Sequence, residues 1–344
     1  MTQGHGLIAV VGAGIVGRAW ATVFSRAGHE VRLYDAQPDA AVAALNAIDT
    51  MLALYEAGGL LDEGGRASAL SRVHPADNLT DAVGEAIYVQ ECVPEILDVK
   101  QSVTEAIAAE ALPDAILASS TSGMIPSSFT ANAPGRDRCL VTHPINPVHL
   151  HSLVEVVPAP WTSDDTVTRA TTLLRRAGLE PVRLSREIDG FLVNRLQSAI
   201  LHEAFRLVSQ GIASSEDVDT AVRAGLAPRW SFMGPFETID LNAPNGIEDY
   251  VQRYEPMYQA LANQQLETAD WAATLKAGLL RRRRDALPIE DLAERRAWRD
   301  QQLLALLQHH ARHGFGRRAL TRDAVPQHPP MASGQPSHEP ELRP

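Results

Sequence analysis

The sequence predicts an α/β Rossmann-type N-terminal domain with a mostly parallel sheet, followed by an all-helical C-terminal domain. A glycine-rich turn near the N-terminus joins a short apolar segment to a helix-length stretch. Short apolar segments then alternate with helix-length stretches up to about residue 187, which favours a parallel sheet covered on both faces. From Gly190 onward only helical periodicity remains. A chain of 344 residues with 45% hydrophobic content is long enough for two such domains.

The first strand and turn predict a dinucleotide site. An apolar run at residues 7–11 leads into a Gly-x-Gly-x-x-Gly motif and then a helix. In this motif the first glycine makes the turn, the second lets the backbone approach the pyrophosphate, and the third lets the helix pack closely. The helix then points its N-terminal amides and dipole at phosphate. The residues expected to bind the cofactor here are Gly12, Gly14, Ile15, Val16 and Gly17.

The second predicted strand ends at Asp35, about 20 residues after the glycine motif. A carboxylate at this place accepts hydrogen bonds from the ribose hydroxyls and repels a 2′-phosphate. No Arg or Lys follows it in Ala36-Gln37-Pro38. The sequence therefore predicts NAD rather than NADP as the cofactor.

The remaining elements follow in order along the chain. Helices are expected at 40–57 and up to about residue 71, and then at 98–111 and 163–177, while strands are expected at 86–89, 115–118, 139–142, 153–157 and 181–184. The second domain is predicted to hold helices at 191–209, 215–224, 247–262 and 289–310. We therefore divide the chain into an NAD-binding domain at 1–187, a helical substrate and dimerisation domain at 188–318, and a disordered tail at 319–344.

Composition excludes several classes of protein. The net charge of −11 argues against a nucleic-acid partner, and the basic run at 281–284 is followed by acidic residues, as in a solvated face or a subunit contact. No signal peptide or membrane span is expected, so the cytoplasm is the predicted location. Cys92 and Cys139 lack metal-ligand spacing and are interpreted as small buried side chains, and no metal is expected.

A histidine and a glutamate form the predicted catalytic pair. His143 lies just past a predicted strand, where open α/β sheets bind ligands. Twelve residues later, Glu155 interrupts the apolar strand at 153–157. A buried carboxylate needs a partner, and a hairpin-like return of the chain makes the imidazole of His143 a natural one. The pair predicts a general base that is oriented by a carboxylate.

Ordered motifs around this pair resemble those of the 3-hydroxyacyl-CoA dehydrogenase superfamily over roughly residues 7–260. The motifs are Ser119-Ser120-Thr121-Ser122-Gly123, His143-Pro144-Ile145-Asn146-Pro147, Glu155 and Gly190-Phe191-Leu192-Val193-Asn194-Arg195. The segments at 229–238 and 241–243 are most similar to the lambda-crystallin and L-gulonate 3-dehydrogenase branch, with L-carnitine dehydrogenase as a near neighbour.

The resemblance implies NAD-dependent oxidation of a 3-hydroxyl, with His143 and Glu155 as the catalytic pair. It further implies that Ser122 and Asn194 hydrogen-bond the reacting oxygen, and that the protein is a homodimer formed through its helical domain. Glu95 and Lys100 are implied to lie along the cofactor. For Lys100, the alternative is a solvated charge on a helix.

The substrate is expected to be a small free L-3-hydroxy acid. Members of the family that act on CoA thioesters have a lysine-rich helical hairpin after the second strand, whereas this hairpin is acidic, with only Arg66 and Arg72 and no lysine between residues 36 and 80. Such a hairpin repels CoA phosphates. Arg229 is the candidate partner of a substrate carboxylate, and an interdomain or intersubunit salt bridge is its alternative.

Three other functions stay open at this level. Trp230, Phe232 and Tyr254 could surround a trimethylammonium group, which keeps L-carnitine dehydrogenase as an alternative. A short-chain 3-hydroxyacyl-CoA dehydrogenase is a second alternative. A non-catalytic crystallin-like protein is a third, although the retained Ser122, His143, Glu155 and Asn194 argue against it.

Overall fold

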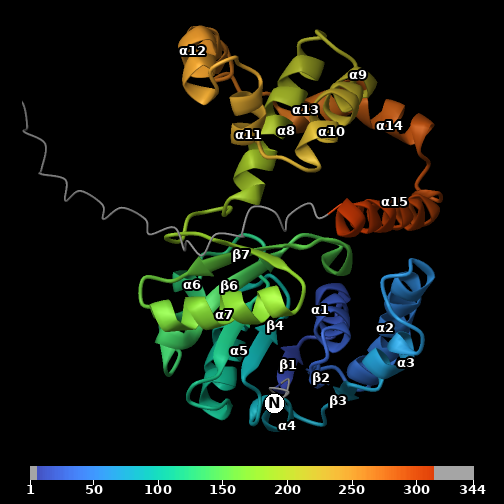
Figure 1. Ribbon diagram of the computed structural model, residues 1–344, viewed down its shortest axis with the longest axis vertical. Coiled ribbons are helices and arrows are strands. Elements are labelled where there is room, and N and C mark those ends of the chain that lie inside the picture. The colour runs from blue at the N-terminus through green and yellow to red at the C-terminus, as the bar shows by residue number, and fades with distance from the viewer. Residues whose placement is uncertain (1–5, 314–344) are drawn as a thin grey trace, which may run out of the picture.

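The computed structural model describes residues 6–313, which form a sheet domain with a helical region beside it (Figure 1). The sheet has eight strands in the order β3-β2-β1-β4-β5-β6-β7-β8. All neighbours are parallel except β6 and β7, which pair antiparallel. The strands are β1 (Ile8–Val11), β2 (Val31–Tyr34), β3 (Val73–Pro75), β4 (Tyr88–Glu91), β5 (Ile116–Ser119), β6 (Cys139–Pro144), β7 (Leu153–Pro158) and β8 (Glu180–Arg183). The predicted mostly parallel sheet is confirmed.

Helices cover both faces of the sheet because alternate strand residues are apolar on both sides. One face packs against α1 (Ile15–Arg26), α2 (Ala40–Ala57) and α7 (Asp164–Arg176). The other face packs against α4 (Leu79–Val83) and α5 (Leu97–Glu110). The short helices α3 (Gly65–Leu70), α6 (Ser127–Thr130), η1 (Arg136–Arg138) and η2 (Val148–Leu150) lie in the connections.

The helical region begins at α8 and rises above the carboxyl-end edge of the parallel strands (Figure 1). Its elements are α8 (Val193–Ser209), α9 (Ser215–Thr220), η3 (Ala221–Leu226), α10 (Ala227–Trp230), α11 (Pro235–Leu241), α12 (Ile247–Gln264), α13 (Trp271–Thr274), η4 (Leu275–Leu279), α14 (Leu280–Ala286) and α15 (Leu292–His313). This agrees with the predicted all-helical second domain. The helical segment expected at 215–224 is divided, because α9 ends at Thr220 and continues as the wider π-helical turn η3.

The last helix, α15, returns to the sheet domain. Leu304 packs with Tyr55 of α2 and Leu150 of η2, and the side-chain amide of Gln308 donates to the carbonyl of Gly58. A Cβ on Gly58 would lie 2.8 Å from a methyl carbon of Leu304, so glycine permits this close approach. The apolar side of α15 is thus partly covered within the chain.

The helical region has almost no apolar core of its own. Between Val193 and His313, Leu304 is the only apolar side chain that is buried, and it packs on the sheet domain. Large apolar side chains are exposed on α11 and α12, including Phe236 at 75% and Leu241 at 67%. A helical bundle normally buries one apolar stripe on each helix, so these faces lack a partner within the described chain.

Two expectations need correction. The segment Ala40–Ala57 has the length and mean hydropathy of a membrane span, contrary to the prediction that no segment has them. In the structure it is α2, which packs against α1 and the sheet through residues such as Ile48 and Leu52. The strand β3 was not predicted, because three residues are too few to show a period. The predicted disordered tail lies outside the described residues.

Candidate active site

The glycine motif forms a tight turn between β1 and α1. Gly12 has a φ of +107°, and a Cβ there would lie 2.6 Å from the carbonyl oxygen of Cys92. A Cβ on Gly17 would collide with the carbonyl of Gly12, so both positions require glycine. Gly14, by contrast, faces open space in front of the N-terminus of α1. An anion can therefore approach the helix amides, as the pyrophosphate of NAD requires.

A cavity of about 720 Å³ adjoins this turn and is lined by Gly14, Arg18, Asp35 and Cys92 among others. Asp35 accepts hydrogen bonds from the backbone amides of Ala13 (2.7 Å) and Gln37 (2.8 Å) through different oxygens. Each of these oxygens keeps acceptor capacity for a ribose hydroxyl. The cavity volume and this carboxylate fit the adenosine part of NAD.

Arg18 is a cavity-lining residue that the sequence reasoning missed. Its Nε donates to the carbonyl oxygens of Ala13 (3.0 Å) and Gly14 (3.3 Å), so Arg18 binds the carbonyl groups of the turn whose Ala13 amide is bound by Asp35. The remaining guanidinium nitrogens make no hydrogen bond recorded within residues 6–313. Its place one residue after Gly17, in the first turns of α1, was the available signal.

His143 and Glu155 face each other across the antiparallel pair of β6 and β7. The two residues are direct register partners, and His143 Nδ1 lies 2.6 Å from Glu155 Oε2. Their side chains are 6% and 0% exposed. Because a carboxylate can only accept, Nδ1 is the donor in this hydrogen bond, and in the neutral form of the ring Nε2 then carries the lone pair. The arrangement is that of a general base with a carboxylate partner.

The second oxygen of Glu155 is bound by the start of the helical region. It accepts the backbone amides of Leu192 (2.7 Å) and Val193 (3.0 Å) at the N-terminus of α8. Burial raises the pKa of Glu155, but the hydrogen bonds from His143 and these two amides outweigh it, so the pKa lies below its ordinary value. Glu155 is thus an ionised carboxylate at neutral pH.

The turn before α8 brings these amides to Glu155. Gly190 and Phe191 both have positive φ, at +71° and +51°. Phe191 is fully buried, and its ring centroid lies 5.4 Å from that of His143. The burial of this ring offsets the cost of a left-handed conformation at a residue with a side chain.

The structure also brings Ser122 and Asn194 together. The side-chain amide of Asn194 donates to the backbone carbonyl of Ser122 at 2.6 Å, which joins α8 to the loop after β5. The same α8 terminus therefore contacts both the serine loop and Glu155. The two residues predicted to bind the reacting oxygen are thus in contact, and their contacts with a substrate stay a prediction.

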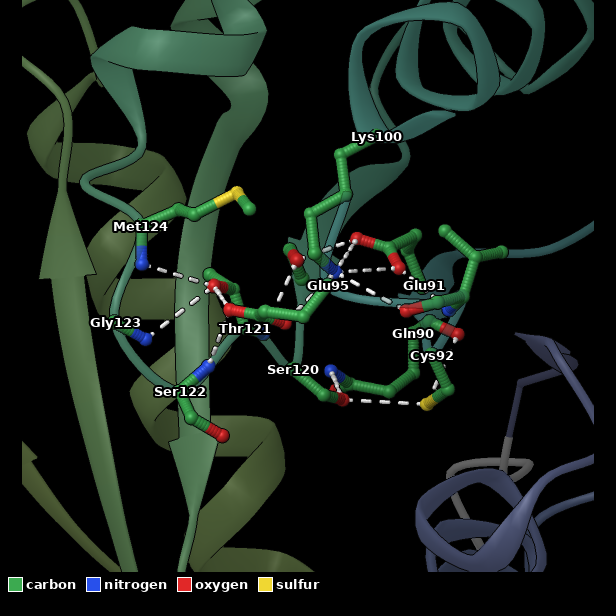
Figure 2. A network of polar contacts seen from close by, with 12 residues as sticks. Gln90, Glu91, Cys92, Glu95, Lys100, Ser120, Thr121, Ser122, Gly123 and Met124 are labelled. Atoms are coloured by element: carbon green, nitrogen blue, oxygen red, sulfur yellow. Dashed lines mark hydrogen bonds and ion pairs between the residues drawn. The ribbon is translucent and has the colours of Figure 1, made fainter. Parts of the chain in front are cut away.

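Lys100 and Glu95 lie in a polar network beside that loop (Figure 2). The Lys100 ammonium lies 3.0 Å from Glu91 Oε1, and its side chain is 1% exposed. The alternative of a solvated helix charge is therefore wrong for Lys100. Glu95 is half-exposed and accepts the backbone amide of Ser122 at 3.1 Å. Contacts of Glu95 and Lys100 with the cofactor stay a prediction.

Arg229 and the predicted aromatic cage are not joined to this site by any contact recorded within residues 6–313. Arg229 lies in α10 and is close enough to Tyr250 of α12 to influence its ionisation. Trp230, Phe232 and Tyr254 are between 38% and 48% exposed. Their roles in substrate binding remain predictions.

Other titratable groups of the described chain do not form a metal centre. No group of three His, Cys, Asp or Glu side chains within residues 6–313 could hold a metal ion. Cys92 and Cys139 are free thiols, and burial raises the pKa of each to about 12. In the basic run, Arg283 lies 3.7 Å from Asp219.

The assembled site can accept a proton from a hydroxyl group that lies beside a bound dinucleotide. It offers a buried imidazole whose Nδ1 is hydrogen-bonded to an ionised carboxylate. It also offers a glycine turn and cavity of the kind that hold NAD. A hydroxyl and a carboxamide, from Ser122 and Asn194, lie on the two elements that meet there.

Comparison with known proteins assigns both the sheet domain and the helical region to one enzyme family. The model for the NAD binding domain of 3-hydroxyacyl-CoA dehydrogenase matches residues 7–188, and that for its C-terminal domain matches residues 190–281. A lambda-crystallin homolog of Bos taurus is 41% identical over 309 residues, covering 88% of this chain and 95% of the relative. An L-carnitine dehydrogenase of Pseudomonas aeruginosa is 34% identical over 312 residues, covering 89% and 96%.

A solved structure is also similar over most of its length. It is a 5-formyl-3-hydroxy-2-methylpyridine 4-carboxylic acid 5-dehydrogenase, an NAD⁺-dependent dismutase, with a TM-score of 0.76 and 27% identity. The match covers 88% of this chain and 98% of that one.

Proposed function

The chain belongs to the 3-hydroxyacyl-CoA dehydrogenase family, and from that premise we propose that it oxidises the 3-hydroxyl of a small free L-3-hydroxy acid such as L-gulonate to the 3-keto acid. It is an NAD-dependent oxidoreductase. The observation that carries the proposal is the buried pair of His143 and Glu155, with Nδ1 and Oε2 at 2.6 Å.

The pair performs the proton part of the reaction. NAD, when bound, supplies the hydride acceptor. His143 Nε2 accepts the proton of the substrate hydroxyl, and the ionised Glu155 stabilises the imidazolium that results. The two α8 amides keep Glu155 in place while the imidazole changes charge.

Ser122 and Asn194 position the reacting oxygen. The contact from Asn194 to the Ser122 carbonyl holds the serine loop against α8. The Ser122 hydroxyl is then available to donate to the substrate oxygen, which aligns the alcohol and polarises the ketone in the reverse direction.

The charge of the α2–α3 hairpin supports a free acid over a CoA thioester. Arg66, one of the two cationic side chains between residues 36 and 80, is bound by Asp49 at 2.6 Å and lies 3.8 Å from Glu56. Arg72 donates to the carbonyl and hydroxyl of Ser68. The charge of Arg66 is therefore opposed by two carboxylates. Arg72 is bound by neutral acceptors and has no ion pair recorded within residues 6–313, so this segment offers one uncompensated cation for the several phosphates of CoA.

L-carnitine is the second candidate substrate, and it is favoured by the similarity to L-carnitine dehydrogenases over most of this chain. The exposed aromatic residues Trp230, Phe232 and Tyr254 provide faces that a quaternary ammonium requires. For a free acid, Arg229 is the proposed partner of the carboxylate, because its guanidinium can bind it at two points. Arg229 lies in α10 of the helical region, near Tyr250 of α12.

A substrate panel separates these candidates. NADH formation is followed with L-gulonate, L-carnitine, 3-hydroxybutyrate and 3-hydroxybutyryl-CoA. We expect the highest kcat/KM with a free hydroxy acid. Arg229→Lys should raise the KM for that acid more than it lowers kcat, whereas Trp230→Ala should impair L-carnitine oxidation selectively if carnitine is the substrate. Turnover of the CoA ester alone would exclude the proposed substrate class.

The role of His143 is tested by His143→Ala. Loss of the general base should lower kcat by about 10²-fold or more while NADH binding persists. His74→Ala is the matched control, because His74 also lies beside a glutamate, Glu30, but is exposed. An active His143→Ala variant would contradict the assignment, and a chain that binds NADH without oxidising any substrate would indicate the crystallin-like alternative.

A further inference from the structure

The loop after β5 is organised by a hydroxyl that the proposed chemistry does not use. Thr121 is fully buried, and its Oγ1 donates to Glu95 Oε1. The same oxygen accepts the backbone amides of Met124 (3.0 Å) and Gly123 (3.4 Å). Thr121 therefore closes the turn at residues 121–124 and anchors it to the segment before α5 (Figure 2).

Glu95 connects this turn to Ser122. Its Oε1 accepts the Ser122 amide at 3.1 Å, in addition to the Thr121 hydroxyl. Its Oε2 lies 3.5 Å from the ammonium of Lys100. The carboxylate thus joins a backbone atom of Ser122 to a buried cation.

The cation is itself fixed. Lys100 Nζ donates to both oxygens of Glu91, at 3.0 and 3.2 Å, and to the carbonyl of Val93 at 3.3 Å. Glu91 also accepts the hydroxyl of Ser119 at 2.5 Å. These contacts attach the carboxyl end of β4 to that of β5, and a buried ion pair with this many partners has few alternative arrangements.

Ser122 is consequently held on both sides of its backbone. Its amide is bound by Glu95, and its carbonyl accepts from Asn194 of α8. Its hydroxyl makes no hydrogen bond recorded among residues 6–313, and Figure 2 shows the Ser122 side chain directed away from Thr121 and Glu95. The backbone contacts therefore fix the position of the Ser122 Cα, from which the hydroxyl is directed away from this network.

We propose that Thr121 is a positioning residue: its hydroxyl fixes the Glu95 carboxylate and the 121–124 turn so that the Ser122 hydroxyl faces the reacting oxygen. Lys100 takes part by holding Glu95, not by offering a free charge. The inference rests on the proposed role of Ser122 in substrate binding. It predicts a larger loss of turnover than of cofactor affinity, because the glycine turn and Asp35, which are expected to hold the adenosine part of the cofactor, lie on other elements than Thr121 and Glu95.

The test compares Thr121→Val with Thr121→Ser. Valine has nearly the same volume but removes the hydroxyl, whereas serine keeps it. We expect Thr121→Val to lower kcat by about tenfold or more, with the Kd for NADH within about twofold of the wild-type value, and Thr121→Ser to restore most of the activity. Wild-type kcat in Thr121→Val, or a parallel loss of NADH affinity, would overturn the proposal.

A double-mutant cycle with Ser122→Ala shows whether Thr121 acts through Ser122. If it does, Thr121→Val causes little further loss of kcat in the Ser122→Ala background. If the two losses multiply, Thr121 has only a structural role and the proposal fails. Should Thr121→Val not fold, as judged from its thermal transition, Thr121→Ala takes its place in the same cycle.

The same cycle separates this proposal from the proposed function. Full activity in Ser122→Ala would refute the role of Ser122 in the reaction. Reduced activity in Ser122→Ala together with wild-type activity in Thr121→Val would refute only the positioning role of Thr121.

Discussion

Asp35 performs two tasks at the end of β2. Its carboxylate holds the amides of Ala13 and Gln37, and it lines the cavity that fits the adenosine part of NAD. A single side chain therefore stabilises the glycine turn, and we expect it also to repel a 2′-phosphate.

We predict that Asp35→Ala combined with Ala36→Arg shifts the preference from NAD toward NADP. The change removes the carboxylate that repels a 2′-phosphate and adds a guanidinium that can bind it. The measurement is kcat/KM with each cofactor, and Ala36→Arg alone is the control. Equal efficiency of the wild-type enzyme with NAD and NADP would show that our interpretation of Asp35 is wrong.

Arg18 should contribute to phosphate binding. Its Nε donates to the carbonyls of Ala13 and Gly14, its other two guanidinium nitrogens make no hydrogen bond recorded within residues 6–313, and Arg18 and Gly14 line the same cavity. We expect Arg18→Gln to weaken NADH binding by about tenfold, since a hydrogen bond to a charged group contributes about 1.5–3 kcal/mol. Competition assays should show a loss for ADP and none for adenosine. An equal loss for both would mean that Arg18 only supports the turn.

At the scale of elements, α15 buries a histidine against the sheet domain. His149 of η2 is 8% exposed and lies beside Tyr55 of α2, with a ring-centroid distance of 6.5 Å. Burial lowers the pKa of His149 to about 4, with Asp300 acting in the opposite direction and Arg26, Arg299 and His151 in the same one. The contact of α15 with η2 therefore depends on a neutral imidazole.

We predict that this contact makes the protein less stable in mild acid. The pKa of His149 is lower in the folded protein than its ordinary value of 6.5. Between about pH 6.5 and pH 4 the unfolded chain therefore binds a proton at His149, whereas the folded chain does not. The contribution is fully present above about pH 6.5 and is lost as the pH falls toward 4, by roughly 3 kcal/mol at most.

Urea unfolding at pH 7 and pH 5 measures this effect. His149→Phe keeps an aromatic ring beside Tyr55 but cannot take up a proton, so its stability should fall less between these pH values than that of the wild type. An identical fall in both proteins would exclude His149 as the source.

At the scale of the molecule, the unpartnered faces of α11 and α12 predict a homodimer. The helical region buries one apolar side chain between Val193 and His313, which is too little to stabilise a separate bundle. A second copy of the chain would cover residues such as Phe236 and Leu241. We therefore predict that the helical domain dimerises through the exposed apolar faces of α11 and α12.

Sedimentation velocity at micromolar concentration should show a dimer. Phe236→Glu should shift the protein toward monomer, because it places a charge in an apolar interface. Val42→Glu on α2 is the control, since Val42 is also an exposed apolar residue, at 57%, but lies in the sheet domain. A monomeric wild-type protein would contradict the prediction.

The sequence by itself determined the features that depend on near neighbours in the chain. The Gly12–Gly17 turn, the strand before it and Asp35 lie within about 30 residues and share one local pattern. His143 and Glu155 were predicted as a pair because a hairpin-like return brings two adjacent segments face to face, and the register of β6 and β7 confirms their contact.

Only the tertiary structure decided which distant groups complete the site. Asn194 meets Ser122 across 72 residues, and Gln308 of α15 meets Gly58 across 250. The burial of Lys100 depends on Glu91 at the end of a different strand, so a sequence window cannot distinguish it from a solvated charge. Such contacts arise from the packing of whole elements, and helical or strand periodicity reports only which face of an element is apolar.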